Sequence, residues 1–128
     1  CIRDRSHTRM INAEGKAVQP DLKTFMAAAA NADWKGTPGY AVVLTNQPGA
    51  DSWPMTAATF ILMHKAPTDA ATAGEALKFF DWAYRKGDKM AADLDYIPMP
   101  DNVVKMVEST WSQQIKDSSG KPLWAVTN

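Results

Sequence analysis

The chain has 128 residues, which is the size of one ordinary domain. Apolar residues make up 45% of it and charged residues 22%, a balance typical of soluble globular proteins. Lysine plus arginine and aspartate plus glutamate both number 14, so the formal net charge is zero. That charge gives no indication of binding to nucleic acid or to an anionic membrane. No apolar run reaches the ~18 residues that indicate a membrane-spanning helix.

Cysteine occurs once, as Cys1, which excludes a disulfide within the chain and a cysteine-based metal site. Two interpretations of Cys1 remain open. Mature bacterial lipoproteins begin with an acylated cysteine, whereas a fragment of a longer protein can begin with any residue. Patterned elements follow almost at once, without the flexible polar tether expected of a lipoprotein. We therefore favour a fragment.

The first elements follow a basic, unpatterned stretch over residues 1–9. MINAEGKAVQP predicts a β-hairpin with strands at 10–11 and 17–18, because Gly15 lies in a turn and can adopt positive φ. Pro20-Asp21 then opens a predicted helix, with apolar residues recurring at helical spacing. The predicted inner face of this helix comprises Leu22, Phe25, Met26, Ala29 and Ala30.

Two apolar stretches predict β-strands. YAVVLT covers residues 40–45, and an extended segment runs from Trp53 to about Lys65, with Pro54 near its start. The residues between them, NQPGADS, are turn formers and predict a loop. Because strands this apolar require cover on both faces, we expect a larger sheet and a partner segment from elsewhere.

The second half of the chain is predicted to be helical. A long helix begins after a cap at Thr68 or Asp69, or one turn later with a Thr72–Glu75 capping box, and ends at Gly87 in a left-handed cap. A short helix covers DKMAADLDY. A third helix is capped by Asp101, and KDSSGKPLW closes the chain as a turn and an extended tail. The predicted inner faces are Leu77, Phe80 and Tyr84, flanked by Ala76, Phe79 and Ala83, on the long helix, and Val104, Val107, Trp111 and Ile115 on the third.

Candidate catalytic residues match no known motif. The sequence has no GxGxxG, P-loop or HExxH motif. We interpret His7 as a surface residue and His64 as a polar strand end rather than as metal ligands. Five serines are possible nucleophiles, but none lies in a G-x-S-x-G motif. They are Ser52, Ser109, Ser112, Ser118 and Ser119. We predict no catalytic residue, no metal site and no cofactor.

Several polar residues allow two interpretations. DSSG, residues 117–120, has the hydroxyls and backbone N–H groups of an anion-binding turn, but also the composition of a solvated turn, which we favour. Asp93 and Asp95 are expected to serve solvation or local capping. Asp81 and Arg85 are spaced for an ion pair on the helix surface.

The aromatic cluster of the long helix also has two interpretations. It could be an interaction stripe, but its helical spacing favours the core, with Trp82 as its most exposed member. The cluster comprises Phe79, Phe80, Trp82 and Tyr84.

Several long blocks resemble a known family. LTNQPGADSWPMTAATFILMHK, ALKFFDWAYRKGDKMAADLDYIPMPDNVV and IKDSSGKPLW resemble, in this order, the C-terminal part of the periplasmic phosphate-binding proteins of bacterial phosphate ABC transporters. ADWKG and INAEGKAVQP resemble the segment that precedes them. The resemblance covers roughly residues 10–124, and residues 1–9 fit it poorly.

This resemblance implies an α/β fold: an incomplete part of the two-lobed, type II periplasmic binding protein fold. The implied organisation is an unmatched end at 1–9, the end of the second lobe at 10–52, an inter-lobe crossing at 53–57, and the C-terminal part of the first lobe at 58–128. Proteins of this kind close by small dihedral changes at such crossings. The implied hinge residues are Trp53, Pro54, Met55 and Thr56.

The resemblance also implies a function: a monomer that binds inorganic phosphate in the periplasm and delivers it to a membrane permease, without nucleic acid. Family members hold phosphate through hydroxyls, backbone N–H groups, an arginine and a carboxylate. A buried carboxylate facing fully ionised sulfate would leave two charges unpaired, which favours phosphate. The family's ligand motifs match no position here, so no ligand-binding residue is expected in this chain. We therefore assign no such role to Arg3, Arg5, Arg9 or Arg85.

Two alternatives remain. The first is a related oxyanion-binding or phosphatase-like protein of the same fold, and the second is an enzyme domain in its own right. The lack of a nucleophile–base pair argues against an enzyme.

Overall fold

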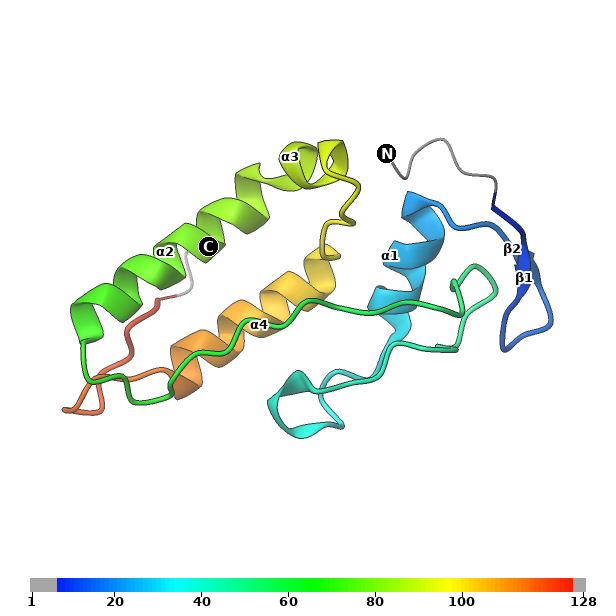
Figure 1. Ribbon diagram of the computed structural model, residues 1–128. Helices are drawn as coiled ribbons and strands as arrows, with labels where there is room; N and C mark the ends of the chain where they lie inside the picture. Colours follow the sequence, from blue (N-terminus) through cyan, green and yellow to red (C-terminus); the bar gives the residue numbers. More distant parts are fainter. Residues whose placement is uncertain (1–6, 126–128) are drawn as a thin grey trace.

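A computed structural model describes residues 7–125 of the chain. It is a small, helix-rich domain with one two-stranded sheet (Figure 1). Its elements, in order, are β1 (Met10–Ile11), β2 (Ala17–Val18), α1 (Leu22–Asn31), the 3₁₀ helix η2 (Pro38–Tyr40), α2 (Ala70–Lys86), α3 (Asp88–Asp93) and α4 (Asp101–Gln114).

The predicted hairpin is confirmed. Strands β1 and β2 pair antiparallel, with Met10 opposite Val18, and Gly15 in the connecting turn has a φ of 72°. The predicted opening of α1 is also confirmed, because Asp21 and Thr24 cap it with reciprocal side-chain bonds to backbone N–H groups. Its predicted inner face is only partly right.

The buried residues of α1 are Ala28, Ala29 and the polar Thr24, whereas Leu22 is exposed. Thr24 is buried because its hydroxyl and its backbone make hydrogen bonds to the helix cap and to the neighbouring loop. Its hydroxyl donates to the carbonyl of Gln19, and its own carbonyl accepts from the N–H of Trp53. At this position, burial is therefore explained by local hydrogen bonds rather than by the hydrophobicity of the side chain.

The two predicted apolar strands are wrong for this structure. Residues 41–45 and 53–65 form no strand, and Tyr40 instead ends η2 with a φ of 59°. Within residues 7–125, the backbone of 55–64 makes no hydrogen bond to other backbone. A strand exists only by pairing, and the β-forming side chains of these segments meet no second strand here. The sheet expected of an α/β fold is therefore limited to the small hairpin.

The predicted helices of the second half are confirmed, as is the predicted cap at Asp69, with two corrections at their ends. Asp69 caps α2 and accepts bonds from both the N–H and the hydroxyl of Thr72, so the capping box one turn later does not form. Gly87 is right-handed, with a φ of −87°, because its N–H continues the helical bonding to Ala83 and α3 begins at once. Asp101 is the first residue of α4 rather than its cap, a position that Pro100 occupies.

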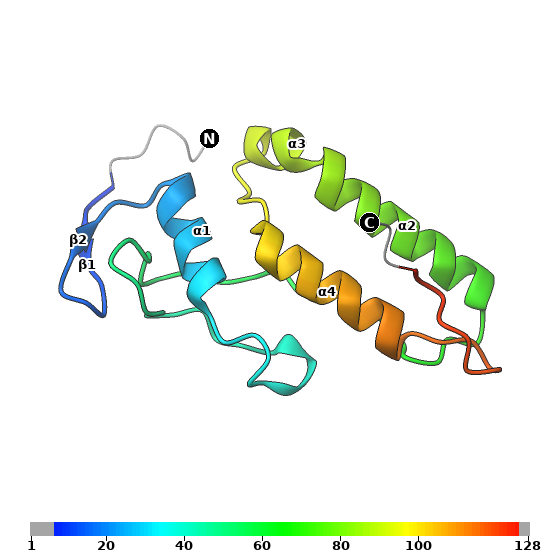
Figure 2. The same ribbon diagram turned by 180° about the vertical axis from the view of Figure 1, so that it is seen from behind.

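Two clusters of buried side chains meet along α4, which lies between α1 and α2 (Figures 1 and 2). One joins Ala29, Trp34, Leu44 and Val103, and the other joins Leu77, Trp111, Ile115 and Trp124. Val107 packs against both. On α4 the core residue of the first turn is thus Val103 rather than the predicted Val104.

The predicted face of α2 is right for Leu77, Phe80 and Tyr84, which pack in the second cluster. Trp82 is 47% exposed, but Phe79 is 58% exposed, so Phe79 rather than the predicted Trp82 is the most exposed member of the aromatic cluster. Phe79 contacts Trp82 in a stacked arrangement with ring centroids 6.0 Å apart. These two rings therefore shield each other on the outer side of α2.

Candidate functional site

The predicted hinge lies where the chain leaves the hairpin and α1 and begins to run beside α4 (Figure 1). Trp53 is buried against Phe25 of α1, and its N–H donates to the carbonyl of Thr24 at 3.0 Å. The carbonyl of Pro54 accepts from the N–H of Asn46 at 2.9 Å, and the Thr56 hydroxyl donates to the carbonyl of Trp53. Met55 is exposed. The backbone anchoring of the crossing therefore ends at Pro54.

The loop that precedes the crossing is fixed by one buried side chain, Asn12. Its amide group donates to the carbonyls of Gly49, Ala50 and Ser52 at 2.8–3.3 Å. Its side-chain oxygen accepts from the N–H groups of Glu14 and Lys16 within the hairpin turn. Asn12 thus ties the hairpin to the loop at 46–52 and holds the start of the crossing.

Four of the five candidate serine nucleophiles make ordinary structural hydrogen bonds: Ser52, Ser109, Ser112 and Ser119. Ser52 is fully buried, and its hydroxyl donates to the carbonyl of Pro48 at 2.6 Å and accepts from the amide of Asn31. Ser112 donates to the carbonyl of Ser109 within α4, and the Ser109 hydroxyl accepts from Gln113. His7 and His64 are both exposed.

The DSSG turn is occupied by its own carboxylate. Asp117 accepts bonds from the N–H and hydroxyl of Ser119 at 2.8 and 2.6 Å and from the N–H of Lys121 at 3.0 Å. The hydroxyl bond from Ser119, followed by the bond from Lys121, lowers the pKa of Asp117. Because a negative oxygen already takes the donors that an anion would need, the turn is a solvated turn.

A charged cluster joins α2 to α4. Arg85 donates to Asp81 at 2.6 Å, as the spacing predicts, but also to Glu108 of α4 at 3.2 Å. The Glu108 side chain is 7% exposed, and this burial raises its pKa even though Arg85 opposes the shift. The pKa of the neighbouring Tyr84 is raised by burial and then by the charge of Glu108. Arg85, paired with two carboxylates, is not free to bind phosphate.

The remaining residues singled out in the sequence lie on the surface or outside the described residues. Asp93 pairs with Lys89 at 2.8 Å on the surface of α3. Arg9 is exposed, whereas Arg3, Arg5 and Cys1 lie outside the described residues. No group of three or more His, Cys, Asp or Glu side chains within residues 7–125 is placed to hold a metal ion.

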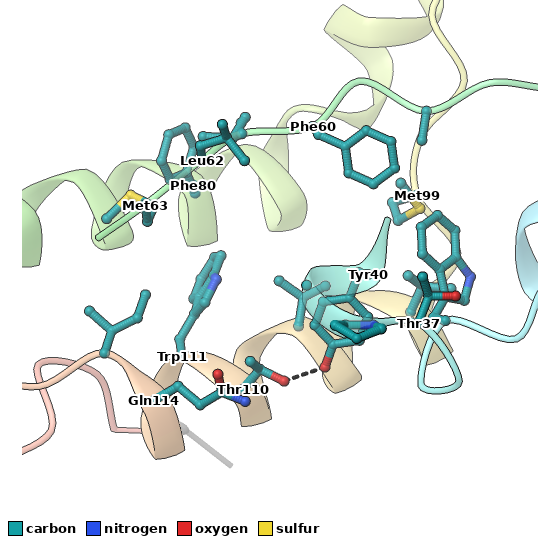
Figure 3. A pocket seen from close by; sticks show the side chains of 18 of the residues that line it. Thr37, Tyr40, Phe60, Leu62, Met63, Phe80, Met99, Thr110, Trp111 and Gln114 are labelled. Atoms are coloured by element: carbon teal, nitrogen blue, oxygen red, sulfur yellow. Dashed lines mark hydrogen bonds between the residues drawn. The ribbon is translucent and has the colours of Figure 1, made fainter. Parts of the chain in front are cut away.

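A cavity of about 490 Å³ lies between the extended segment at 58–63 and α4 (Figure 3). In Figure 3 the segment that carries Phe60 and Leu62 runs along one side, and Trp111 and Tyr40 line the opposite side. The Tyr40 hydroxyl is hydrogen-bonded to that of Thr110. The charged residues that line the cavity are Lys35 and Lys65, and the other lining residues are mostly apolar or aromatic. This composition suits apolar side chains rather than a phosphate ion.

Comparisons with known proteins relate the chain to phosphate-binding proteins. No protein-family model matches the sequence. The chain is 45% identical over 113 residues to the phosphate-binding protein PstS of Pasteurella multocida, a match that covers 88% of this chain and 33% of that protein. It is 44% identical over 111 residues to PstS of Xylella fastidiosa, covering 87% and 30% respectively. PstS of Haemophilus influenzae is 45% identical over 105 residues, covering 82% and 31%.

The chain therefore spans about a third of the length of the curated relatives it matches. No helix within residues 7–125 has both the length and the apolar character needed to cross a membrane. The matches to the three PstS proteins confirm the family that the sequence indicated. Over most of its length, the chain is related to about one third of a PstS phosphate-binding protein.

Proposed function

We propose that this chain forms the C-terminal third of a periplasmic protein that binds inorganic phosphate and delivers it to the permease of an ABC importer. The observation that carries the proposal is 44–45% identity, over 82–88% of the chain, to phosphate-binding proteins of three organisms. In this role the protein acts as a monomeric binding protein without cofactor, nucleic acid or catalysis.

The phosphate ligands of such a protein lie outside this chain. Three observations support this. Arg85 is neutralised by Asp81 and Glu108, the DSSG turn is closed on its own carboxylate, and the buried hydroxyl of Ser52 is satisfied within its loop. A dehydrated anion requires several converging donors that are not already bonded. The candidates described above are already committed to partners within the chain.

The proposed contribution of this chain is mechanical. In a two-lobed fold, Trp53, Pro54, Met55 and Thr56 form one of the hinge crossings. The anchoring of Trp53 to α1 at one end, and the lack of backbone–backbone hydrogen bonds at 55–64 among the described residues, support this role. Dihedral changes at Met55 or Thr56 break no backbone–backbone hydrogen bond within the described residues. The one bond at stake is that from the Thr56 hydroxyl to the carbonyl of Trp53, so the crossing can bend there at low cost.

A chimera tests the function. The 113 matched residues of Pasteurella multocida PstS are replaced by this chain, and binding of inorganic phosphate is measured by calorimetry at neutral pH, with sulfate as the control anion. We expect the chimera to bind phosphate in preference to sulfate. A folded chimera without phosphate affinity would contradict the proposed function.

The same titration on the isolated 128-residue chain tests where the ligands lie. We expect no binding tighter than a Kd of ~1 mM, because the chain offers no converging donors. Micromolar binding by the isolated chain would show that these residues themselves contain a phosphate site.

A further inference from the structure

A buried carboxyl group lies at the interface between α2 and α4, which run side by side (Figures 1 and 2). Glu108 of α4 has only 7% of its side chain exposed, and it is the only charged residue that is buried within residues 7–125. A buried carboxylate is costly unless it is paired with a cation, and otherwise it takes up a proton. Glu108 therefore needs either a cation or a proton.

The cation at this interface is shared. Arg85 of α2 donates to Glu108 at 3.2 Å, but it donates to Asp81 at the shorter distance of 2.6 Å. The Asp81 side chain is itself only 21% exposed, so one guanidinium group serves two shielded carboxyl groups. When both are ionised, the negative charge of the cluster exceeds its positive charge. Pairing with Arg85 thus compensates Glu108 only in part.

The two carboxyl groups also face each other across the interface. The side chains of Asp81 and Glu108 lie within hydrogen-bonding distance. Two ionised carboxylates have only acceptors and repel each other, so this bond requires a proton on one of them. Burial raises the pKa of Glu108, Arg85 opposes this shift, and the hydrogen bond to Asp81 raises the pKa further. Glu108 is therefore the group that takes up the proton.

The other titratable neighbours of Glu108 do not supply the missing positive charge. Tyr84 of α2 is uncharged at neutral pH, because burial and then the charge of Glu108 raise its pKa above the ordinary value of 10. Lys105 lies one turn away on α4, and its charge is the weakest of the influences on the pKa of Glu108. Lys105 is also exposed, so solvent screens it. The balance is set by Arg85, Asp81 and Glu108.

We propose that Glu108 and Asp81 form a pH-sensitive link between α2 and α4, in which one proton from solvent joins the two carboxyl groups beside Arg85. In the protonated state, Glu108 donates to Asp81 while Asp81 keeps its bond from Arg85. In the ionised state, the two carboxylates repel each other and Arg85 alone holds them together. The link is therefore stronger at acidic pH. The inference does not depend on the proposed function, because all of these groups lie within this chain.

Thermal unfolding of the 128-residue chain between pH ~4.5 and pH ~8 tests the link. Because the pKa of Glu108 is raised in the folded chain, its contribution to stability is complete below the ordinary value of 4.5 and is lost as pH rises through the folded value. Glu108→Gln is the informative variant, since an amide donates to Asp81 at every pH and carries no charge. We expect its melting temperature to equal that of the wild type at pH ~4.5 and to exceed it by ~4 °C at pH ~8. Parallel pH profiles of the two proteins would overturn the inference.

Glu75→Gln is the matched control. It makes the same chemical change on α2, where the Glu75 side chain is 73% exposed and pairs with Lys78 on the surface. Because an exposed ion pair contributes little to stability, this variant should follow the wild-type pH profile. A gain at pH ~8 as large as that of Glu108→Gln would attribute the effect to the lower overall negative charge, and the link would be refuted.

A titration of the Glu108 carboxyl carbon by NMR tests the link without relying on the stability of a variant. In the wild-type chain its midpoint should lie above 4.5. Asp81→Asn should lower the midpoint, because it removes the neighbouring negative charge, and Arg85→Gln should raise it, because it removes the cation. Side chains with a merely structural role would leave the midpoint unchanged. A wild-type midpoint at or below 4.5, or one that neither variant moves, would contradict proton sharing between α2 and α4.

Discussion

The loop at 46–52 and the segment at 57–63 are close together in the chain but differ in burial. The loop is built of turn formers, yet its Ser52 is fully buried. The segment is apolar and β-forming, yet Leu62 is almost fully exposed. Composition alone predicts the reverse.

The difference lies in where each segment finds its hydrogen-bonding partners. Asn12 supplies a donor to three carbonyls of the loop, and Glu14 accepts from the N–H of Gly49, so the hairpin satisfies the loop from within the chain. The segment at 57–63 needs a strand, and no strand lies beside it in residues 7–125. Burial follows the satisfaction of the backbone as much as the apolarity of side chains.

The largest effect should come from breaking the support of the loop. Asn12→Ala removes the side-chain bonds to three carbonyls and two N–H groups, of which only the Gly49 carbonyl keeps another partner, the N–H of Ser52. We expect the variant to destabilise the chain by about 3 kcal/mol. Urea unfolding of the full chain measures this. Asn102→Ala is the control, since this exposed side chain makes one bond of 3.3 Å to the carbonyl of Ala30 and should cost less than about 0.5 kcal/mol. Similar stabilities of the two variants would refute the central role of Asn12.

Gly49→Ala tests the same loop through its backbone. Gly49 has a φ of 111°, and an added Cβ would collide with the Asn31 amide and crowd the Ser52 hydroxyl. We expect a loss of about 2 kcal/mol in the free energy of unfolding. Gly74→Ala is a control of opposite sign, because that helical position has free space around it and alanine should stabilise α2 by about 0.5–1 kcal/mol. A Gly49→Ala variant as stable as the wild type would mean that the loop relaxes freely.

The DSSG turn is also stabilised by hydrogen bonds within the chain, and this smaller contribution to stability should depend on pH. The pKa of Asp117 is lowered in the folded chain, so this carboxylate contributes stability above its unfolded pKa of ~4 and loses it as pH falls through the folded value. Between pH ~4 and ~2, the wild type should therefore lose more stability than Asp117→Asn. Thermal unfolding across this range measures the difference. Parallel pH profiles would contradict a stabilising role for the Asp117 carboxylate.

Local signals explain which parts of the fold could be predicted. The hairpin, α1 and α2 follow from turn formers, helical periodicity and the caps at Asp21 and Asp69, all of which act within a few residues. The strands at 40–45 and 53–65 could not be predicted correctly for this chain, because strand formation depends on a distant partner and not on composition.

The candidate site shows the same division. The ion pair of Asp81 and Arg85 follows from i, i+4 spacing, whereas its extension to Glu108 depends on how α2 and α4 pack. Nothing in the sequence around Asn12 distinguishes it from an ordinary turn asparagine, since its acceptors lie 37–40 residues away. The hinge over Trp53–Thr56 and the assignment of lobes remain predictions.

The smallest effect on stability should come from a substitution in the apolar segment at 57–63. Leu62→Ser removes a large apolar side chain, but that side chain is already in solvent and loses no burial on substitution. We expect the free energy of unfolding of the isolated chain to change by less than about 0.5 kcal/mol, measured by urea unfolding. Leu77→Ala is the matched control, because this leucine is fully buried between α2 and α4 and its truncation should cost about 3 kcal/mol. A large loss in Leu62→Ser would mean that segment 57–63 is already buried in the isolated chain, and the contrast with the loop would then disappear.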